Sequence, residues 1–506
     1  MAHETELKLF LAESAHRLFL RHPLLKQARR REVCRLVNLY YDTPELGLRT
    51  RGIALRLRAH GKLWLQTVKC AGQTAGGLSA RPEWEIPYIG HFDFSGIDDA
   101  EIRSWLENEK VKARLAPVFE TNFQRMAWLF EPVAGTRIEL AFDRGWIAAA
   151  GRREAISEIE LELIAGDATQ LFALARALAT RVAVTPAPLS KAERGYALFR
   201  GQAAMPVKAT PVALTGDEDP ASAFDRIALT CLDQLQRNYA GASTSDDPEY
   251  IHQMRVATRR LRAALRLFAP LLPAGYPEPI VIRLRDLMGI LGQARDLDVL
   301  LAEIAEPVLG ALPDEPRLAA LVGIITERRF DRRRAAIDFL RSPRFGQIAL
   351  ETLEALHARS ATAQVGAGET AVCLIAFANE RLRRLRRKVL RLAAAARIDD
   401  PPSLHALRIG IKRLRYALEF FAPLARPKAM ARMLGQLAAL QETLGQINDL
   451  ANAGDLLMDC AGEEGPLREA VTLIGGWHGP RYQELLAAVP RGLKQLGKLD
   501  LPKLRP

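Results

Sequence analysis

The segment AHETELKL (residues 2–9) alternates charged side chains with apolar or neutral ones. Successive side chains of a β-strand point to opposite faces, so Glu4, Glu6 and Lys8 share one face of the expected strand. Two carboxylates about 7 Å apart can bind one divalent cation together, or one each. The ammonium group of Lys8 adds a positive charge suited to phosphate. An edge strand whose charged face meets water is the alternative that this segment alone leaves open.

Later segments of residues 1–200 repeat this arrangement and are predicted to be mostly short strands, with charged faces of both signs. Carboxylates occur at Glu83, Glu85, Glu158, Glu160 and Glu162, basic side chains occur at Arg56, Arg58, Lys69 and Arg81, and Lys191 and Arg194 follow one helical turn apart. If the strands close into a barrel with these faces inward, a water-filled tunnel results that can hold metal ions beside a highly charged anion. Faces turned outward would form a solvated surface, and the two-residue period allows both arrangements.

Length and composition narrow the class of protein. At 506 residues the chain is expected to form two or more domains. No apolar run approaches the ~18 residues that span a bilayer, and charged residues stand where a signal peptide needs an apolar segment, so neither membrane insertion nor export is expected. The five cysteines form no CxxC pair. This argues against a disulfide framework or a zinc site and suits a reducing cytoplasm.

The net charge of +12 predicts an anionic partner. Nucleic acid, a membrane surface and a polyanion such as polyphosphate all have the required sign. Aromatic residues make up only 7% of the chain and are not interleaved with the basic residues, so a base-stacking platform is poorly supported and nucleic acid is not the expected partner. The sequence leaves the oligomeric state open.

An internal repeat organises the second half of the chain, which follows a Pro- and Gly-containing linker at 201–219 and has a helical pattern. The segment HQMRVATRRLR begins at His252, and its counterpart HALRIGIKRLR begins at His405, an offset of 405 − 252 = 153 residues. The same offset relates Asp296 to Asp449. Two related helical bundles, at about 220–370 and 371–495, are therefore expected.

Each repeat carries a basic stripe along one helix face, because its positions follow the spacing i, i+3, i+7 and i+10. The first stripe is His252, Arg255, Arg259 and Arg262, and the second is His405, Arg408, Lys412 and Arg415. A solvated basic surface is the alternative. The histidines are expected to gain charge near their usual pKa of ~6.5, which would strengthen anion binding toward pH 6. Residues 381–388 form a further basic run.

The ExExK pattern of the first strand resembles the signature of CYTH domains, also called triphosphate tunnel metalloenzymes. Further matches follow in order along residues 1–200: Tyr41-Asp42-Thr43-Pro44, the Arg56/Arg58 strand, Lys69, the strand Glu158–Glu162, and Ser190-Lys191 with Arg194-Gly195-Tyr196. The resemblance implies an eight-stranded antiparallel β-barrel with flanking helices, whose charged tunnel binds a triphosphate and Mg²⁺ or Mn²⁺. Members of this family cleave inorganic triphosphate, thiamine triphosphate or RNA 5′-triphosphates, or cyclise ATP.

The resemblance also implies roles for the charged residues. The metal ligands would be Glu4, Glu6, Glu160 and Glu162. The phosphoryl oxygens would contact Lys8, Arg56, Arg58, Lys69, Arg81, Lys191 and Arg194. Glu83, Glu85 and Asp143 are candidates to bind a second metal or to orient the attacking water. Glu139 and Glu158 are equally expected to be ion-pair partners that fix arginine side chains.

The 153-residue repeat resembles the CHAD domain, a helical module whose histidine- and arginine-bearing helices bind inorganic polyphosphate. This resemblance covers about residues 220–495. It implies a C-terminal all-α domain of two repeated helical bundles. The predicted organisation is a CYTH domain at 1–200, a linker at 201–219, a CHAD domain at 220–495 and a tail at 496–506.

The expected function is therefore metal-dependent hydrolysis of inorganic triphosphate by a cytoplasmic enzyme with a polyphosphate-binding module, which could associate with polyphosphate granules. A non-catalytic polyphosphate-binding protein, in which the barrel is a sensor, is the alternative from another class. A CYTH enzyme that hydrolyses thiamine triphosphate or cyclises ATP is the alternative within the enzymes. The carboxylates favour catalysis, because a pure anion-binding site has no need of several acidic groups that face the anion.

Overall fold

The computed structural model describes residues 2–61, 63–70, 72–75, 77–365 and 373–505. The chain divides into two compact units. The barrel unit contains Met1–Val207, Gln236–Ser243 and Leu340–Ala358, and the helical unit contains Lys208–Leu235, Thr244–Phe339 and Arg359–Pro506. Each unit thus draws on more than one segment of the chain.

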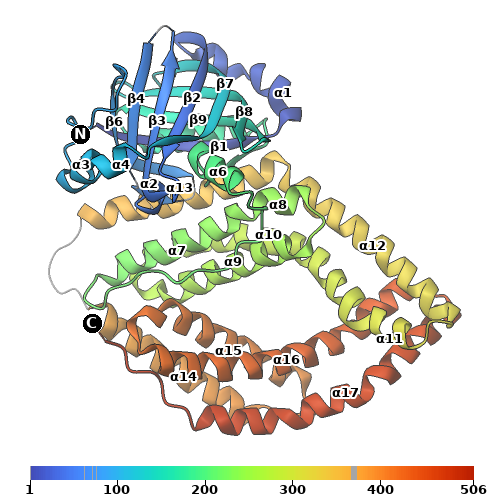
Figure 1. Ribbon diagram of the computed structural model, residues 1–506. Helices are drawn as coiled ribbons and strands as arrows, with labels where there is room; N and C mark the ends of the chain where they lie inside the picture. Colours follow the sequence, from blue (N-terminus) through green and yellow to red (C-terminus); the bar gives the residue numbers. More distant parts are fainter. Residues whose placement is uncertain (1, 62, 71, 76, 366–372, 506) are drawn as a thin grey trace. The chain divides into compact units, whose positions relative to one another are not determined.

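Eight of the described strands close into an antiparallel barrel in the barrel unit (Figure 1). In order around the barrel they are β1 (Ala2–Leu11), β9 (Arg152–Ala165), β8 (Arg137–Ala149), β7 (Ala116–Phe130), β2 (Arg30–Asp42), β3 (Ile53–His60), β4 (Leu63–Cys70) and β6 (Leu78–Pro87), and β6 pairs with β1 to complete the circle. Two short strands extend it: β5 (Gln73–Ala75) beside β6 and β10 (Val184–Pro186) beside β1. The predicted eight-stranded antiparallel barrel is confirmed.

The two-residue period of β1 divides its side chains between two environments. Leu7, Leu9 and Leu11 are fully buried and belong to the apolar layer outside the barrel wall. Glu4, Glu6 and Lys8 line the interior. The charged rows therefore face inward, because the leucines have helices to pack against on the other side of the wall.

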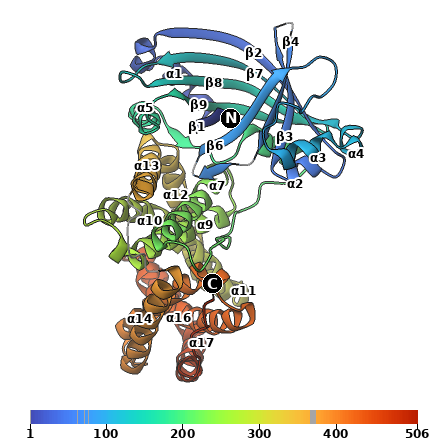
Figure 2. The same cartoon turned by 90° about the vertical axis from the view of Figure 1, so that its left-hand side faces the viewer.

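Short helices flank the barrel (Figure 2). They are α1 (His16–Leu20), α2 (Gly47–Thr50), α3 (Ala100–Glu107), α4 (Glu109–Lys112), α5 (Thr169–Ala179) and α6 (Lys191–Phe199), together with 3₁₀ turns at Glu13–Ala15 and Pro23–Gln27. α5 packs on β1 and β9, and α6 packs on β7, β8 and β9. α6 thus delivers its first residue, Lys191, to the barrel interior.

Two segments from the helical half of the sequence also belong to the barrel unit. They come from α8 (Tyr239–Thr244) and from the first part of α13 (Pro343–Val365). Tyr239 stacks on Phe345 with ring centroids 5.3 Å apart, and Gln347 donates a hydrogen bond to the Ala179 carbonyl at 3.1 Å. The sequence pattern gives no indication of this packing.

The helical unit shows the internal repeat directly. Its helices are α7 (Pro220–Arg237), α9 (Pro248–Leu267), α10 (Pro277–Val299), α11 (Glu306–Ala311), α12 (Pro316–Leu340), α14 (Leu374–Ala395), α15 (Pro401–Phe420), α16 (Pro427–Ala461) and α17 (Gly465–Gly497), with a π-helical turn at Leu300–Ala305 and 3₁₀ turns at Ala269–Leu271 and Ala422–Leu424. Both ends of α15 lie 153 residues after the ends of α9. No helix among the described residues combines the length and apolar character needed to cross a membrane.

Reciprocal contacts between α9 and α15 relate the two repeats as a pseudo-twofold axis would. Arg260 on α9 contacts Glu419 on α15. The 153-residue counterparts of this pair are Arg413 and Arg266. Burial has the larger effect on the pKa of Arg266, and the charge of Arg413 lowers that pKa further. The same two positions therefore lie within electrostatic range of each other in both directions across the α9–α15 contact. The predicted pair of related helical bundles is confirmed.

Candidate functional site

A cavity of about 780 Å³ occupies the barrel interior. Its lining includes the predicted site residues Glu4, Glu6, Lys8, Arg56, Arg58, Lys69, Arg81, Glu83, Glu85, Glu160, Glu162 and Lys191. Asp143 and Arg194 are not part of the lining. The structure thus brings together all but two of the residues that the sequence assigned to a tunnel.

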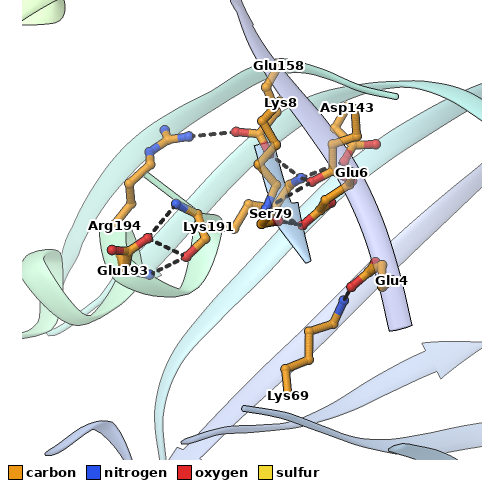
Figure 3. Close-up of polar contacts among 12 residues, drawn as sticks. Glu4, Glu6, Lys8, Lys69, Ser79, Asp143, Glu158, Lys191, Glu193 and Arg194 are labelled. Atoms are coloured by element: carbon orange, nitrogen blue, oxygen red, sulfur yellow. Dashed lines mark hydrogen bonds and ion pairs between the residues drawn. The ribbon is translucent and has the colours of Figure 1, made fainter. Parts of the chain in front are cut away.

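The carboxylates of β1 contact basic side chains from β1 itself, β4 and β6 (Figure 3). Lys69 Nζ lies 2.6 Å from Glu4 Oε2, and Arg81 Nε lies 3.6 Å from the same atom. Glu6 Oε1 lies 2.7 Å from Arg81 Nη2 and 2.9 Å from Lys8 Nζ. Burial raises the pKa of Glu6, but Lys8 and Arg81 outweigh it and hold the pKa below its usual value.

Lys191 and Arg125 hold a second group of carboxylates. Lys191 Nζ lies 2.7 Å from Asp143 Oδ2 and 3.0 Å from Glu160 Oε1, and it also contacts Glu158. Arg125 donates two hydrogen bonds to Asp143, at 2.8 and 2.7 Å, and contacts Glu160. Burial raises the pKa of Glu160, yet Lys191, Arg125 and Lys8 bring it well below the usual range.

Asp143 and Glu158 therefore lie outside the cavity lining and form ion pairs with basic side chains that line it. Asp143 is fully buried, and its contacts are with Arg125 and Lys191. Glu158 accepts a hydrogen bond from Arg194 at 3.1 Å, and Arg194 also bonds Glu154 at 2.6 Å. The ion-pair role considered for Glu158 agrees with these contacts.

The motif around α6 explains how Lys191 reaches the cavity. Ser190 and Glu193 form a capping box at the start of the helix, so Ser190 is the N-cap and Lys191 is the first helical residue. A Cβ on Gly195 would lie 2.2 Å from Phe119 Cε2, so only glycine permits this close approach of α6 to the barrel. Tyr196 donates a 2.9 Å hydrogen bond to Asp42, whose carboxylate also accepts bonds from the backbone of α2.

Strands β3, β4 and β6 supply the opposite wall of the cavity. Arg56 Nη2 lies 3.5 Å from Glu83 Oε1, and Lys69 Nζ lies 2.9 Å from Glu83 Oε2. Arg58 Nη1 is farther from its carboxylate, 4.0 Å from Glu85 Oε2. Burial, followed by the charge of Arg56, lowers the pKa of Arg58 to about 10. The Arg58 side chain thus has less compensation from acidic groups than its neighbours.

Glu162 identifies where a divalent cation would fit. Burial and the charges of Glu4 and Glu139 raise its pKa to about 7, and it has no ion pair with any described residue. Asp143, Glu158 and Glu160 also place ligand atoms within 4.8 Å of one another, but the ammonium of Lys191 contacts all three. Glu162, a carboxylate near the charge of Glu4, offers the oxygen donors that a hard divalent cation prefers.

The helical unit brings the two predicted basic stripes together at the contact between α9 and α15. Arg259 and Lys412, which are counterparts in the repeat, lie close enough for the charge of Arg259 to lower the pKa of Lys412. Among the described residues, buried nitrogen atoms without a hydrogen-bond partner occur in Arg255, Arg259, Arg262, Arg408 and Arg415. These arginines are partly dehydrated without a matching number of acidic partners, which is the condition of an anion-binding surface.

The titration of this basic surface differs from the sequence-based expectation. Burial, Arg408 and Arg259 lower the pKa of Lys412 to about 7. Burial and Arg295 lower the pKa of His252, so its protonation falls below the pH at which we expected it. His405 is exposed, with Nδ1 2.7 Å from Asn448 Oδ1. Burial and neighbouring arginines thus bring the pKa of the Lys412 ammonium close to neutrality.

Comparisons with known proteins find a family match for each half of the chain. A model of the CYTH domain matches residues 2–196, and a model of the CHAD domain matches residues 226–458. An uncharacterized protein of Mycobacterium tuberculosis is 30% identical over 401 residues, which cover 75% of this chain and 74% of that protein. The chain belongs to the proteins that join a CYTH domain to a CHAD domain.

Two further relatives each match one part of the chain. The inorganic triphosphatase of Haemophilus influenzae is 35% identical over 164 residues, 32% of this chain, and the match spans 46% of that relative's length. The crystal structure of the CHAD domain from Ricinus communis is 34% identical, covers 60% of this chain and all of that domain, and has a TM-score of 0.51. CYTH triphosphate tunnel enzymes depend on metal ions, which agrees with the carboxylates that line the cavity.

Sequence reasoning missed several residues of the CYTH and CHAD sites. Arg125 lines the barrel cavity and joins Asp143 to Glu160, and Tyr40 lies beside Arg56. The charges of Arg285 and Arg413 act on Arg262 in the CHAD domain. The two-residue period of β7 could have shown that Arg125 and Phe123 share a face of the strand. Only the closed barrel shows that this face points inward.

Proposed function

We propose that the CYTH domain hydrolyses inorganic triphosphate to pyrophosphate and phosphate, and that the CHAD domain binds inorganic polyphosphate. The observation that carries the first part is a cavity in which basic side chains from five strands and α6 converge on carboxylates. The match to a relative named an inorganic triphosphatase supports this choice of substrate. The paired basic stripes of α9 and α15 support the second part.

The basic side chains perform the main task of this reaction, because a triphosphate is a multiply charged anion that repels its nucleophile. Arg56, Arg58 and Arg81 would bind phosphoryl oxygens through their planar donor groups, and Lys8, Lys69 and Lys191 would add point charges. Most of these cations now contact carboxylates. The substrate would take over part of each cation's coordination, while the carboxylates offset the positive charge of the cavity.

The residues present fit a divalent cation, for which we propose Mg²⁺ or Mn²⁺. Glu4, Glu6, Glu160 and Glu162 would hold it, and Glu162, whose pKa is raised to about 7, would be bound in its deprotonated form. When bound, the cation neutralises phosphoryl charge and fixes the geometry of the triphosphate. Asp143 supports the site by keeping Lys191 and Arg125 in place.

Glu83 and Glu85 are the proposed groups that orient the attacking water. Glu83 forms ion pairs with both Arg56 and Lys69. Glu85 accepts a 2.8 Å hydrogen bond from Thr67 and has Arg58 only at 4.0 Å. Its carboxylate is less neutralised, so Glu85 is the better placed of the two to accept a proton from water.

Phosphate release by the full chain tests the enzymatic proposal. Inorganic triphosphate, ATP and thiamine triphosphate are each supplied with Mg²⁺, with Mn²⁺ and with a chelator. We expect metal-dependent release that is fastest from inorganic triphosphate. Faster turnover of another substrate would reassign the specificity, and the absence of turnover with tight triphosphate binding would favour a sensor.

A binding titration of the full chain tests the CHAD proposal. Replacing Arg255, Arg259, Arg408 and Lys412 by alanine should remove polyphosphate binding at the α9–α15 surface, and binding by the unaltered chain should weaken steeply with salt. Duplex DNA at equal phosphate concentration should compete poorly. Unchanged polyphosphate binding by the fourfold variant would reject the α9–α15 surface as the site.

A further inference from the structure

The outer face of α14 carries a row of basic residues that the α9–α15 site does not use. Arg383, Arg384, Arg387, Lys388 and Arg391 are all exposed. None of the five forms an ion pair or hydrogen bond with another described residue. Their positions i, i+4 and i+8, with the neighbours at i+1 and i+5, place them on one side of the helix.

This face points away from the α9–α15 site. α14 packs on α15 through Val389 and Leu392, since a Cβ on Gly410 would lie 3.6 and 2.8 Å from their side chains. Gly410 is two residues from both Arg408 and Lys412, so it lies about 200° around α15 from them. The basic face of α14 is in turn on the side opposite Val389. The body of α15 therefore separates the two basic surfaces, and Figure 1 shows α14 and α15 side by side.

Packing of the repeat does not require these basic residues. α7 precedes α9 as α14 precedes α15, yet α7 carries as many acidic as basic residues. Two of them are paired: Arg226 contacts Glu218, and Asp225 contacts Arg359. The buried face of α14 is apolar, with Phe377, Leu382 and Val389. The basic face is thus a property of the second repeat alone.

We propose that the exposed face Arg383–Arg391 of α14 is a second polyphosphate-binding surface, so that one CHAD domain holds two polyphosphate chains at once. The inference rests on the proposed binding of polyphosphate. Arginine side chains match phosphate oxygens, and nine helical residues provide about 12 Å of charged surface. Among the described residues, α14 exposes no large apolar side chain for a bilayer and no aromatic for nucleobases.

Two sites on opposite sides of α15 would make the protein a cross-linker of polyphosphate. A chain bound at the α9–α15 surface and another on α14 would be joined by each protein molecule. Long polyphosphate would then form large assemblies with the protein, because each chain also offers many sites. A protein with a single surface would coat the chains without joining them.

The test compares three variants of the full chain. The α14 variant is R383E/R387E/R391E, and the α9–α15 variant is the fourfold alanine replacement described above. The matched control, R334E/R432E/R491E, makes the same change in net charge at exposed arginines on α12, α16 and α17. Calorimetry with short polyphosphate gives the stoichiometry, and light scattering with long polyphosphate measures cross-linking.

We expect the α14 variant to lose one binding equivalent and the scattering, whereas the control keeps both. An unchanged stoichiometry, or an equal loss in the control, would overturn the proposal. Binding to duplex DNA or anionic vesicles that falls in the α14 variant, with polyphosphate stoichiometry unchanged, would assign the surface to that ligand instead. If the α14 variant loses its equivalent while the fourfold variant loses none, the α9–α15 site fails and the α14 site stands. R383Q/R387Q/R391Q repeats the test without reversed charges, and thermal unfolding verifies the fold of each variant.

Discussion

Lys69 Nζ on β4 lies 2.6 Å from Glu4 Oε2 on β1, so a proposed phosphate-binding group and a proposed metal ligand are ion-pair partners across the barrel interior. Lys69 also lies 2.9 Å from Glu83. Such pairs avoid isolated charges in a half-buried cavity, which would be costly. Substrate and metal would arrive together with compensating charges, so the internal pairs could open without leaving either partner uncompensated.

Replacing Glu4 by glutamine should reduce triphosphate hydrolysis to background, because it removes one oxygen donor for the metal. Lys69 keeps Glu83 as a partner, so the barrel should remain folded. Phosphate release in saturating Mg²⁺ or Mn²⁺ measures the loss, and thermal unfolding measures the fold. Glu107→Gln, on the exposed side of α3, is the control. A wild-type rate for Glu4→Gln would remove this residue from the metal site.

Replacing Arg56 by alanine should weaken triphosphate binding by roughly 1.5–3 kcal/mol, the contribution of a charge-assisted hydrogen bond. Arg56 lines the cavity and has Glu83 as its carboxylate partner. Calorimetry on metal-loaded protein gives the affinity, and Arg137→Ala, at an exposed position on β8, provides the baseline. If both variants bind as tightly as the unaltered protein, Arg56 has no contact with the substrate.

The affinity of the CHAD domain for polyphosphate should fall as pH rises from 7 to 9. Lys412 has a pKa of about 7 because of burial and of the charges of Arg408, Arg259 and Arg415, against which Asp449 acts alone. A bound polyanion raises that pKa, so binding takes up a proton and weakens by up to about tenfold per pH unit above 7.

Lys412→Arg tests this origin of the pH dependence, because arginine stays charged throughout the range. The affinity of Lys412→Arg for polyphosphate should stay nearly constant from pH 7 to 9. The affinity of Lys412→Gln should also be independent of pH in this range, but lower. The same low pKa destabilises the ligand-free fold: the cost is complete below about pH 7 and disappears as pH rises toward the ordinary lysine value. An unaltered slope in Lys412→Arg would assign the titration to another group.

Local patterns in the sequence were sufficient for most of the barrel and its charged lining. The alternation in β1 and β9 specifies which side chains share a face, and the motif around Lys191 specifies the start of α6. The direction of those faces depends on closure by the β1–β6 pairing, a contact about 75 residues apart that no local pattern encodes. Arg125 was missed for the same reason, since its importance arises from contacts with β8 and β9.

The packing of α13 on the barrel was also beyond sequence reasoning. Its apolar residues Phe345, Leu350 and Leu353 fit a helical bundle as well as a barrel surface. Arg176 on α5 lies 3.0 Å from Glu354, a pair that no spacing rule predicts. The repeat was readable in α9 and α15 because both copies keep their register, whereas α13 has no counterpart to compare.

Gly346 offers a direct test of the contact between α13 and the barrel. A Cβ at this position would lie 2.0 Å from the Val184 carbonyl oxygen on β10, so Gly346→Ala forces backbone atoms apart. We expect a loss of about 1–3 kcal/mol in the free energy of unfolding, as for other overpacked sites. Gly323→Ala on α12 is the matched control, because a Cβ there meets nothing within 4 Å. It should stabilise its helix by about 0.5–1 kcal/mol. Denaturant unfolding separates the two, and a Gly346→Ala protein as stable as Gly323→Ala would mean that α13 does not press on β10 in solution.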